Sequence, residues 1–329
     1  MMTAVKNVLV VGSGSIGMRH VASLRSLVPA AKVSFLRESG RSGSSPALDP
    51  EFGLFTSLEE AIAARPQLMV IANPSSMHLR YVQAAILAGI PFYAEKPVIT
   101  SRADLTALRS VVDSAGAVPI NMVGCNLRFL PSLRRLRALL QDKAIGRVVR
   151  ATFEAGQWLP DWRPQQDYAQ SYSAKAELGG GVLLDLIHEV DAARWLLGDF
   201  DTVQGTIGKF SDLAIETEDT AALILSRRQG PLTSIQLDYV SRTPVRRYTF
   251  IGDRGTLHWD LRRKRLSMTD ERGTETMLAT GDDDFSVPAT YFAAMAELLA
   301  AIAAGRPTSQ PIEEGMAALE LIFTIKEAN

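Results

Sequence analysis

The fold is decided by the segment Val8-Leu9-Val10-Val11-Gly12-Ser13-Gly14-Ser15-Ile16-Gly17, where an apolar strand runs into a G-x-G-x-x-G turn. A helix is expected to follow over residues 18–27. Gly12 permits the tight turn, Gly14 lets a phosphate approach the backbone, and Gly17 lets the helix pack closely on the strand. The free N–H groups at the helix N-terminus then face the anion. Glycine-rich turns are common, but a position between strand and helix predicts a dinucleotide-binding site.

The composition bounds the class of protein. The chain has 329 residues, of which 47% are hydrophobic and 22% charged, so we expect a globular protein with two cores. The net charge is −1 with dispersed basic residues, which predicts a small-molecule partner and no nucleic acid. We see no signal peptide or membrane span, so we predict a cytoplasmic protein without a membrane partner. The single cysteine, Cys125, is expected to be a packed residue rather than a reactive thiol.

Short apolar runs alternate with helical segments over the first part of the chain, and the runs lie at 8–11, 33–36, 68–72, 92–94 and 120–123. Nearly continuous apolar runs are typical of parallel strands buried on both faces. Helical periodicity that ends at a glycine occupies the intervals, as over 78–88 and 101–114. We therefore predict an α/β fold in which residues 1–123 form a doubly wound Rossmann domain that binds a dinucleotide.

The alternation of short apolar runs with helical segments ends after residue 123. We expect a helix over 131–140, a strand over 148–154, a polar aromatic loop over 158–178 and a long helix over 182–197. Alternating segments then predict an open, mostly antiparallel sheet, with strands at 202–209, 220–226, 232–239, 247–251 and 256–260. Residues 124–329 are thus predicted to form a substrate-binding α/β domain. Because a half-polar sheet face of this size needs a cover, we predict a homo-oligomer, a dimer or tetramer, that packs through it.

A second motif, Tyr93-Ala94-Glu95-Lys96-Pro97, ends one of the predicted parallel strands. The carboxyl ends of such strands are where ligands bind. Pro97 restricts Lys96 to an extended backbone, which directs the lysine side chain toward the cleft. We interpret Lys96 as a functional residue, with a solvated surface charge as the alternative.

Asp185 and His188 lie three residues apart in the helix expected over 182–197, on the side opposite an apolar stripe. This spacing lets a carboxylate contact an imidazole. A histidine, with an ordinary pKa of about 6.5, is suited to accept a hydroxyl proton while hydride leaves the same carbon. The alternative is a histidine that is hydrogen-bonded at a domain boundary.

The order of these motifs resembles the Gfo/Idh/MocA family of nicotinamide-dependent sugar oxidoreductases. The matching residues are Gly12 to Gly17 with His20, Asn73-Pro74 with His78, Ala88-Gly89 leading to Glu95-Lys96-Pro97, Arg128-Phe129, and Gly179-Gly180-Gly181 with Asp185, His188 and Asp191. The loop around Trp162 further resembles a branch of the family associated with bacterial surface-sugar pathways. The resemblance implies a Rossmann domain followed by an α/β domain, and an NAD(P)-dependent dehydrogenase or reductase that acts on CH–OH groups.

The resemblance also implies catalytic roles. Lys96 would hold the reacting hydroxyl or polarise the carbonyl oxygen, His188 would accept the proton, and Asp185 would orient or contact sugar hydroxyls. Family members most often place the aspartate four residues before the histidine, whereas the separation here is three. A lysine, with an ordinary pKa of about 10.4, needs desolvation or a nearby charge to act as a base. Lys96 therefore acts electrostatically, accepts the proton itself, or shares that role with His188.

The cofactor is expected to contact the glycine turn and matching family positions, namely Gly12, Gly14, Ser15, Ile16, Gly17, Asn73, His78, Glu95 and Lys96. An acidic residue at the end of the second strand usually accepts the ribose hydroxyls of NAD, but this chain has Arg37-Glu38-Ser39-Gly40-Arg41 there. Arg37, Ser39 and Arg41 favour the extra phosphate of NADP. Glu38 would select NAD if it turned inward, and a solvated turn is a third alternative. We favour NADP over NAD.

The aromatic loop mixes rings with polar groups, a combination that suits the apolar faces and hydroxyls of sugars. By resemblance, Trp162 and Arg163 lie against the nicotinamide, while Tyr168 and Tyr172 contact the substrate. A purely structural role for the tryptophans is the alternative.

Three other polar residues are less specific. Asn126 and Arg128 are assigned to the substrate, with a role in joining the domains as the alternative. We expect His20 to pack on its helix. Because no His/Cys cluster has metal-ligand spacing, no metal is predicted.

The leading hypothesis is hydride transfer between nicotinamide C4 and a carbinol carbon of a pyranose, an amino sugar or a nucleotide-linked sugar. One alternative is redox-assisted elimination or hydrolysis of a glycoside with a retained cofactor. The other is a non-catalytic NADP-binding regulatory protein, since dinucleotide folds are reused for regulation. The presence of Lys96, Asp185 and His188 disfavours the regulatory hypothesis.

Overall fold

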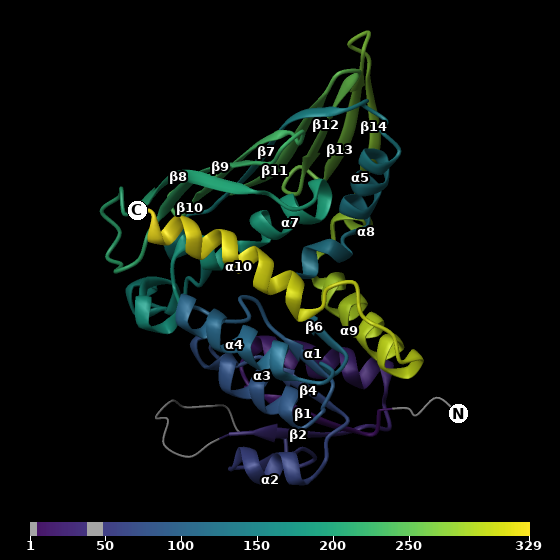
Figure 1. The fold of residues 1–329 in the computed structure, drawn as a ribbon, viewed down its shortest axis with the longest axis vertical. Coiled ribbons are helices and arrows are strands. Elements are labelled where there is room, and N and C mark those ends of the chain that lie inside the picture. The colour runs from purple at the N-terminus through teal and green to yellow at the C-terminus, as the bar shows by residue number, and fades with distance from the viewer. Residues whose placement is uncertain (1–4, 38–48) are drawn as a thin grey trace. The chain divides into compact units, whose positions relative to one another are not determined.

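The computed structural model describes residues 5–37 and 49–329 (Figure 1). Contacts divide the chain into two compact units. The first contains the described residues up to Cys125 together with Tyr291–Met316, and the second contains Asn126–Thr290 and Ala317–Asn329. The contacts thus group residues 291–316 with the first unit, whereas the sequence analysis assigned every residue after 123 to the second domain.

The first unit contains a six-stranded parallel sheet in the order β3-β2-β1-β4-β5-β6. Its strands are β1 (Asn7–Val11), β2 (Lys32–Leu36), β3 (Gly53–Phe55), β4 (Leu68–Ile71), β5 (Phe92–Ala94) and β6 (Asn121–Val123). This order and orientation are those of a Rossmann domain, so the predicted fold is confirmed. The short edge strand β3 was not predicted, because Gly53-Leu54-Phe55 is neither long nor buried enough to give an apolar run.

Helices flank this sheet, and they are α1 (Ser15–Leu27), α2 (Leu58–Ala63), α3 (His78–Leu87) and α4 (Arg102–Ser114). Ser57 Oγ caps α2 by accepting from the Glu60 N–H, and Ser101 Oγ caps α4 by accepting from the Asp104 N–H. α3 and α4 pack side by side (Figure 1). The short η1 (Ser75–Met77) leads from the end of β4 into α3. Because the strands are parallel, the loops that follow the carboxyl ends of β1, β4 and β5 lie at the same edge of the sheet.

The second unit is built on an eight-stranded sheet in the order β14-β13-β12-β11-β7-β10-β9-β8. The strands are β7 (Val148–Gly156), β8 (Thr202–Gly208), β9 (Thr220–Ser226), β10 (Leu232–Asp238), β11 (Val245–Gly252), β12 (Gly255–Asp260), β13 (Arg265–Asp270) and β14 (Glu275–Thr280). Only the β7–β10 pair is parallel, which confirms the mostly antiparallel prediction. β13 and β14 were not predicted, since the apolar residues of β14, Met277, Leu278 and Ala279, are consecutive and do not alternate with polar ones.

One face of this sheet is the core of the second unit. Tyr248 and Trp259 stack there with ring centroids 4.6 Å apart. The Trp259 indole N–H donates to Ser132 Oγ in α5 (Pro131–Gln141), and the Tyr248 hydroxyl donates to Glu189 in α7 (Ile187–Leu197). Helices α5 and α7 therefore cover the same face. On the other face, the side chains of β9 and β10 are half-buried or exposed.

The helix predicted over residues 182–197 is wrong as one continuous element. The structure has α6 (Val182–Asp185) and α7, separated at Leu186, whose φ of −100° and ψ of 30° leave the α region. Both helices are buried on nearly all sides, so apolar periodicity gave no signal for a break. Before them, the aromatic loop forms η3 (Leu159–Trp162), η4 (Tyr168–Gln170), η5 (Tyr172–Ala174) and η6 (Ala176–Leu178).

The C-terminal region contributes α8 (Asp282–Phe285), α9 (Val287–Ala304) and α10 (Ile312–Glu327). α9 is long and apolar enough to cross a membrane by length and composition, in contrast to our expectation that no segment would be. Within the first unit, however, one face of α9 is buried, through Ala294, Met295, Leu298 and Ala301. The core helix of a globular protein passes the same length and composition test, so α9 is weak evidence for a membrane.

Candidate active site

The glycine turn shapes the end of β1. Gly12 has a φ of +98°, and a Cβ there would lie 2.7 Å from both the Ala72 carbonyl oxygen and the Asn73 nitrogen. A Cβ on Gly17 would come closer than 3.0 Å to the Gly12 carbonyl oxygen, whereas a Cβ on Gly14 would have no described heavy atom within 4 Å. Gly12 and Gly17 therefore hold the strand–turn–helix geometry, and the Gly14 backbone is open to a ligand.

The first turn of helix α1 has the features of an anion-binding site. Gly14 is its N-cap, and no side chain from the described parts of the chain caps it. Its first turn starts at exposed Ser15 and half-buried Ile16 and contains no acidic residue. The N–H groups of this turn and the positive end of the helix dipole are thus suited to the pyrophosphate of a dinucleotide.

Two more polar side chains lie at the same edge of the sheet. Arg37 follows β2, and its Nε donates to Ser13 Oγ in the glycine turn at 2.9 Å. Asn73 follows β4, and both its amide atoms are buried with no hydrogen-bond partner among the described residues. Because such an amide is costly, it fits a ligand that supplies the missing partners. Ser39 and Arg41, which were predicted to accompany Arg37, lie outside the described residues.

His78 joins two loops of this edge. Its ring is fully buried, with Nε2 2.8 Å from the Asn73 carbonyl oxygen and Nδ1 3.0 Å from the Pro97 carbonyl oxygen. Burial lowers the pKa of His78, and a neutral imidazole donates to only one of these carbonyls at a time. His78 thus ties the loop after β4 to the loop after β5, and its direct contact with a cofactor stays a prediction.

Glu95 is held by a residue that we assigned to helix packing. His20 Nε2 in α1 lies 2.7 Å from Glu95 Oε1, and the His20 ring is fully buried. Glu95 Oε2 accepts a hydrogen bond from the Lys96 backbone N–H at 3.3 Å. Burial and the charge of Glu95 raise the pKa of Tyr93, whose ring centroid lies 4.6 Å from that of His20. The sequence did not reveal this link between α1 and the lysine segment, because the two residues are 75 positions apart.

Lys96 follows the carboxyl end of β5. It is partly exposed, and the Lys96–Pro97 peptide bond is cis. The glycine turn follows β1 and Asn73 follows β4, so all three lie at the same edge of one parallel sheet. A partly exposed ammonium there can reach a ligand that occupies this edge.

In the second unit, Asp185 ends α6 and is only 4% exposed. Its Oδ2 accepts a hydrogen bond from the Tyr239 hydroxyl at 2.6 Å, and the carboxylate also hydrogen-bonds the Tyr172 hydroxyl. The charge of Asp185, followed by burial, raises the pKa of Tyr172. Tyr239 could not be singled out from the sequence, because a single tyrosine at the end of a strand is ordinarily a core residue.

His188 lies in the first turn of α7, after the helix break that separates it from Asp185. It is partly exposed, and the predicted contact between the two residues stays a prediction. The next residue, Glu189, is fully buried and is bound by Arg246 at 2.8 Å and by the Tyr248 hydroxyl at 3.0 Å. These contacts fix the start of α7 on the sheet and so determine where His188 lies.

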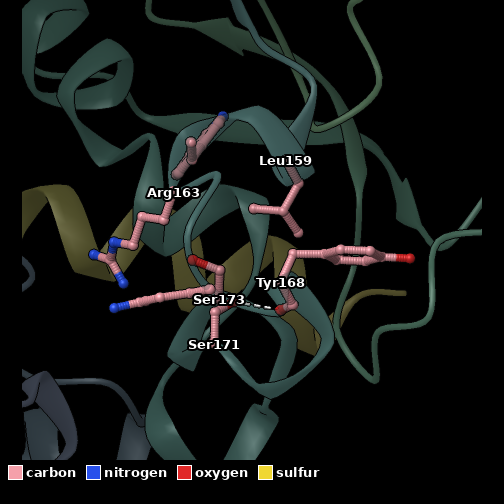
Figure 2. A pocket seen from close by; sticks show the side chains of 7 residues that line it. Leu159, Arg163, Tyr168, Ser171 and Ser173 are labelled. Carbon is pink, nitrogen blue, oxygen red and sulfur yellow. Dashed lines mark hydrogen bonds between the residues drawn. The ribbon is translucent and has the colours of Figure 1, made fainter.

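The aromatic loop forms a small pocket within the second unit (Figure 2), lined by Leu159, Trp162, Arg163, Gln166, Tyr168, Ser171 and Ser173. The Arg163 guanidinium lies 5.0 Å from the centroid of the Tyr172 ring. The Tyr168 hydroxyl accepts a hydrogen bond from the Ala214 N–H at 3.2 Å, and in Figure 2 its ring points away from Arg163. The indole nitrogen of Trp162 is buried and has no partner among the described residues. The loop thus brings Arg163 and Tyr172 together and directs Tyr168 elsewhere.

Asn126 and Arg128 make buried contacts in the second unit. The Asn126 amide donates to Thr290 Oγ1 at 2.7 Å. The Arg128 guanidinium forms a two-pronged ion pair with Asp191, at 2.9 and 2.5 Å. Both contacts lie within one unit, so a role in joining the domains and contact with the substrate both stay predictions for these residues. Across residues 5–37 and 49–329, no group of three or more His, Cys, Asp or Glu side chains is placed to hold a metal ion.

Comparison with known proteins assigns the family. A family model described as "Oxidoreductase family, NAD-binding Rossmann fold" matches residues 6–123, and one described as "GFO/IDH/MocA C-terminal domain" matches residues 133–258. The chain belongs to the Gfo/Idh/MocA family. These two matches cover the glycine turn, Lys96, Asp185 and His188, so the family indicated by the motifs is confirmed.

Individual members of the Gfo/Idh/MocA family are more distant. The chain is 28% identical to inositol 2-dehydrogenase 2 of Saccharopolyspora erythraea, over 70% of this chain and 66% of the relative. It is 26% identical to levoglucosan dehydrogenase of Pseudarthrobacter phenanthrenivorans, over 73% of this chain and 64% of the relative. The chain therefore spans slightly less than two thirds of these relatives. A solved levoglucosan dehydrogenase in complex with NADH shares the fold, with a TM-score of 0.82 and 19% identity over 98% of this chain and 96% of that one.

Proposed function

We propose that this protein oxidises the CH–OH group of a sugar or cyclic polyol, or reduces the corresponding carbonyl, with a nicotinamide dinucleotide. The observation that carries the proposal is the sheet edge of the first unit, where the uncapped α1 turn, the unpartnered Asn73 amide and Lys96 lie together. The relatives' names, inositol and levoglucosan dehydrogenases, support a polyhydroxylated ring as the substrate.

The residues present fit a dinucleotide. The α1 turn would bind the pyrophosphate through its N–H groups, and Asn73 would gain the hydrogen-bond partners it lacks. A bound nicotinamide would supply the acceptor or donor of the hydride. Arg37 beside Ser13 supports NADP over NAD, because a guanidinium there suits a 2′-phosphate.

In this proposal, Lys96 and His188 have different roles toward the reacting hydroxyl. The Lys96 ammonium holds the substrate oxygen and stabilises the negative charge that develops on it. His188 accepts the hydroxyl proton during oxidation and returns it during reduction. Asp185 is the hydrogen-bond acceptor that orients the substrate.

The test begins with fluorescence titration of NADH and NADPH, followed by turnover of a panel of sugars and polyols at the nicotinamide absorbance band. We expect Lys96→Ala to lose most turnover while NAD(P)H binding persists. Lys32→Ala is the matched control. Lys32 is an exposed lysine at the amino end of β2, whereas Lys96 lies at the edge of the same sheet formed by the carboxyl ends of the strands. Near-normal turnover in Lys96→Ala would contradict the assignment, and binding of NAD(P)H without turnover of any substrate would favour the regulatory alternative.

The cofactor preference has its own test. Arg37→Ala is expected to weaken the binding of NADPH by about tenfold, near 1.4 kcal/mol, and to leave the binding of NADH almost unchanged. Equal losses for the two cofactors would reject a role for Arg37 at the 2′-phosphate.

A further inference from the structure

Tyr239 is fixed in the second unit by its backbone. It follows β10 directly, its N–H donates to the Asp219 carbonyl oxygen at 2.8 Å, and its carbonyl oxygen accepts from the Leu159 N–H at 2.9 Å. The side chain is 0% exposed, and the Trp162 ring packs edge-on against it with centroids 5.3 Å apart. Few rotamers are open to a ring confined in this way, so the position of its hydroxyl is determined.

That hydroxyl points at one atom of the candidate site. It donates to Asp185 Oδ2 at 2.6 Å, which is a short, charge-assisted hydrogen bond between two buried groups. Asp185 itself lies at the last residue of a four-residue helix, next to the break at Leu186. The local backbone therefore constrains the carboxylate less than a long helix would, and the phenol supplies a fixed point.

We propose that Tyr239 is a positioning residue, which holds the Asp185 carboxylate in the orientation that receives the substrate hydroxyls. This inference rests on the proposed function. Burial, followed by the charge of Asp185, keeps the pKa of Tyr239 well above its usual value, so the phenol remains a donor across the assay range. The second phenol on the carboxylate, Tyr172, belongs to the aromatic loop and is partly exposed, so it differs from Tyr239 in being accessible to a ligand.

The experiment removes the hydroxyl and keeps the ring. In Tyr239→Phe we expect kcat for the best substrate to fall about 10- to 100-fold, the range for loss of a hydrogen bond to a charged group. KM for NAD(P)H should not change. Ser132→Ala is the control, because Ser132 is equally buried in the second unit and its hydroxyl oxygen accepts a buried hydrogen bond from the Trp259 indole N–H, while neither residue is proposed to act on the substrate or to position a residue that does. We expect it to lower the melting temperature while kcat stays within about threefold of the wild type.

A double-mutant cycle tests whether Tyr239 acts through Asp185. Once Asp185→Asn is present, adding Tyr239→Phe should lower kcat by less than about threefold, because the carboxylate that it positions is gone. Additive losses in the double variant would overturn the proposal. So would equal kcat losses in Tyr239→Phe and Ser132→Ala, since that result would indicate a general loss of stability.

Crystal structures of the wild type and Tyr239→Phe give a readout that does not need turnover. We expect the Asp185 carboxylate to rotate or to occupy two conformers in the variant, and an unchanged carboxylate would refute the positioning role. If the wild type turns over no sugar or polyol, the proposed function fails, and this structural comparison still decides whether Tyr239 positions Asp185.

Discussion

Two glycines of the same turn should respond in opposite ways to the same added methyl group. Gly17 faces the Gly12 carbonyl oxygen, and a Cβ there would come closer than 3.0 Å to that backbone atom. Gly14 has no described heavy atom within 4 Å of its Cβ position. Gly17→Ala should therefore destabilise the first unit, while Gly14→Ala should leave stability nearly intact and interfere with whatever approaches the turn.

The magnitude at Gly17 follows from two opposed effects. Overpacking costs about 1–3 kcal/mol, and this site lies at the upper end because the obstructing atom is main chain and cannot rotate away. Replacing glycine by alanine within a helix stabilises the helix by about 1 kcal/mol. The net loss is about 2 kcal/mol, which corresponds to a fall in melting temperature of roughly 4–8 °C for a unit of this size. At Gly14, an N-cap position, replacement by alanine costs about 1 kcal/mol or less.

The assay pairs thermal unfolding with NAD(P)H titration for both variants. We expect Gly17→Ala to melt several degrees below Gly14→Ala, and we expect Gly14→Ala to bind NAD(P)H at least about tenfold more weakly than the wild type, near 1.4 kcal/mol. Wild-type stability in Gly17→Ala would refute the steric reasoning. Wild-type affinity in Gly14→Ala would refute the close approach of a ligand to this part of the turn.

Three further predictions concern the second unit. Asp219 is buried and accepts four hydrogen bonds, which hold its pKa below the usual 3.8, so Asp219→Asn should cost about 1–3 kcal/mol at pH 7 in urea unfolding. A lowered pKa means that the stabilisation is present above pH 3.8 and is lost as the pH falls through the folded-state value, so the two proteins should converge in acid; a constant difference would contradict this. Arg128→Met should cost about 3–5 kcal/mol by leaving Asp191 buried without its ion pair, and Arg128→Met/Asp191→Leu should recover part of the loss. The polar face of the sheet predicts a homo-oligomer, and a monomeric mass by light scattering at micromolar concentration would exclude it.

Five strands of the Rossmann sheet were predictable because they are short and mostly apolar and buried, so composition alone marks them, whereas the exposed edge strand β3 was not. The glycine turn was equally clear, since its neighbours in sequence are its neighbours in space. Lys96 and Asp185 were singled out by motif, and their roles stay predictions. The alternating strands of the second sheet were also predicted, and their antiparallel pairing is confirmed.

Other features depend on contacts between distant parts of the chain. The bond from His20 to Glu95 and the bond from Tyr239 to Asp185 join residues 75 and 54 positions apart, and no local pattern encodes them. The break at Leu186 was missed because a helix buried on all sides has no polar face whose phase could reveal an irregularity. β14 was missed because its apolar residues are consecutive and do not alternate with polar ones as in a half-buried strand.

The first unit is built from two segments that are far apart in the chain, and this affects how it folds during synthesis. β6 is an edge strand, and residues near the end of the chain complete it: the Val123 N–H donates to the Gln310 carbonyl oxygen, while Thr308 and the Ile312 N–H bond to Asn121. A ribosome that has produced only the first 125 residues has made a sheet whose last strand still exposes these groups. The dinucleotide-binding unit can thus reach its final form only after nearly the whole polypeptide has emerged, and a fragment cut at Cys125 would carry an unprotected, aggregation-prone border.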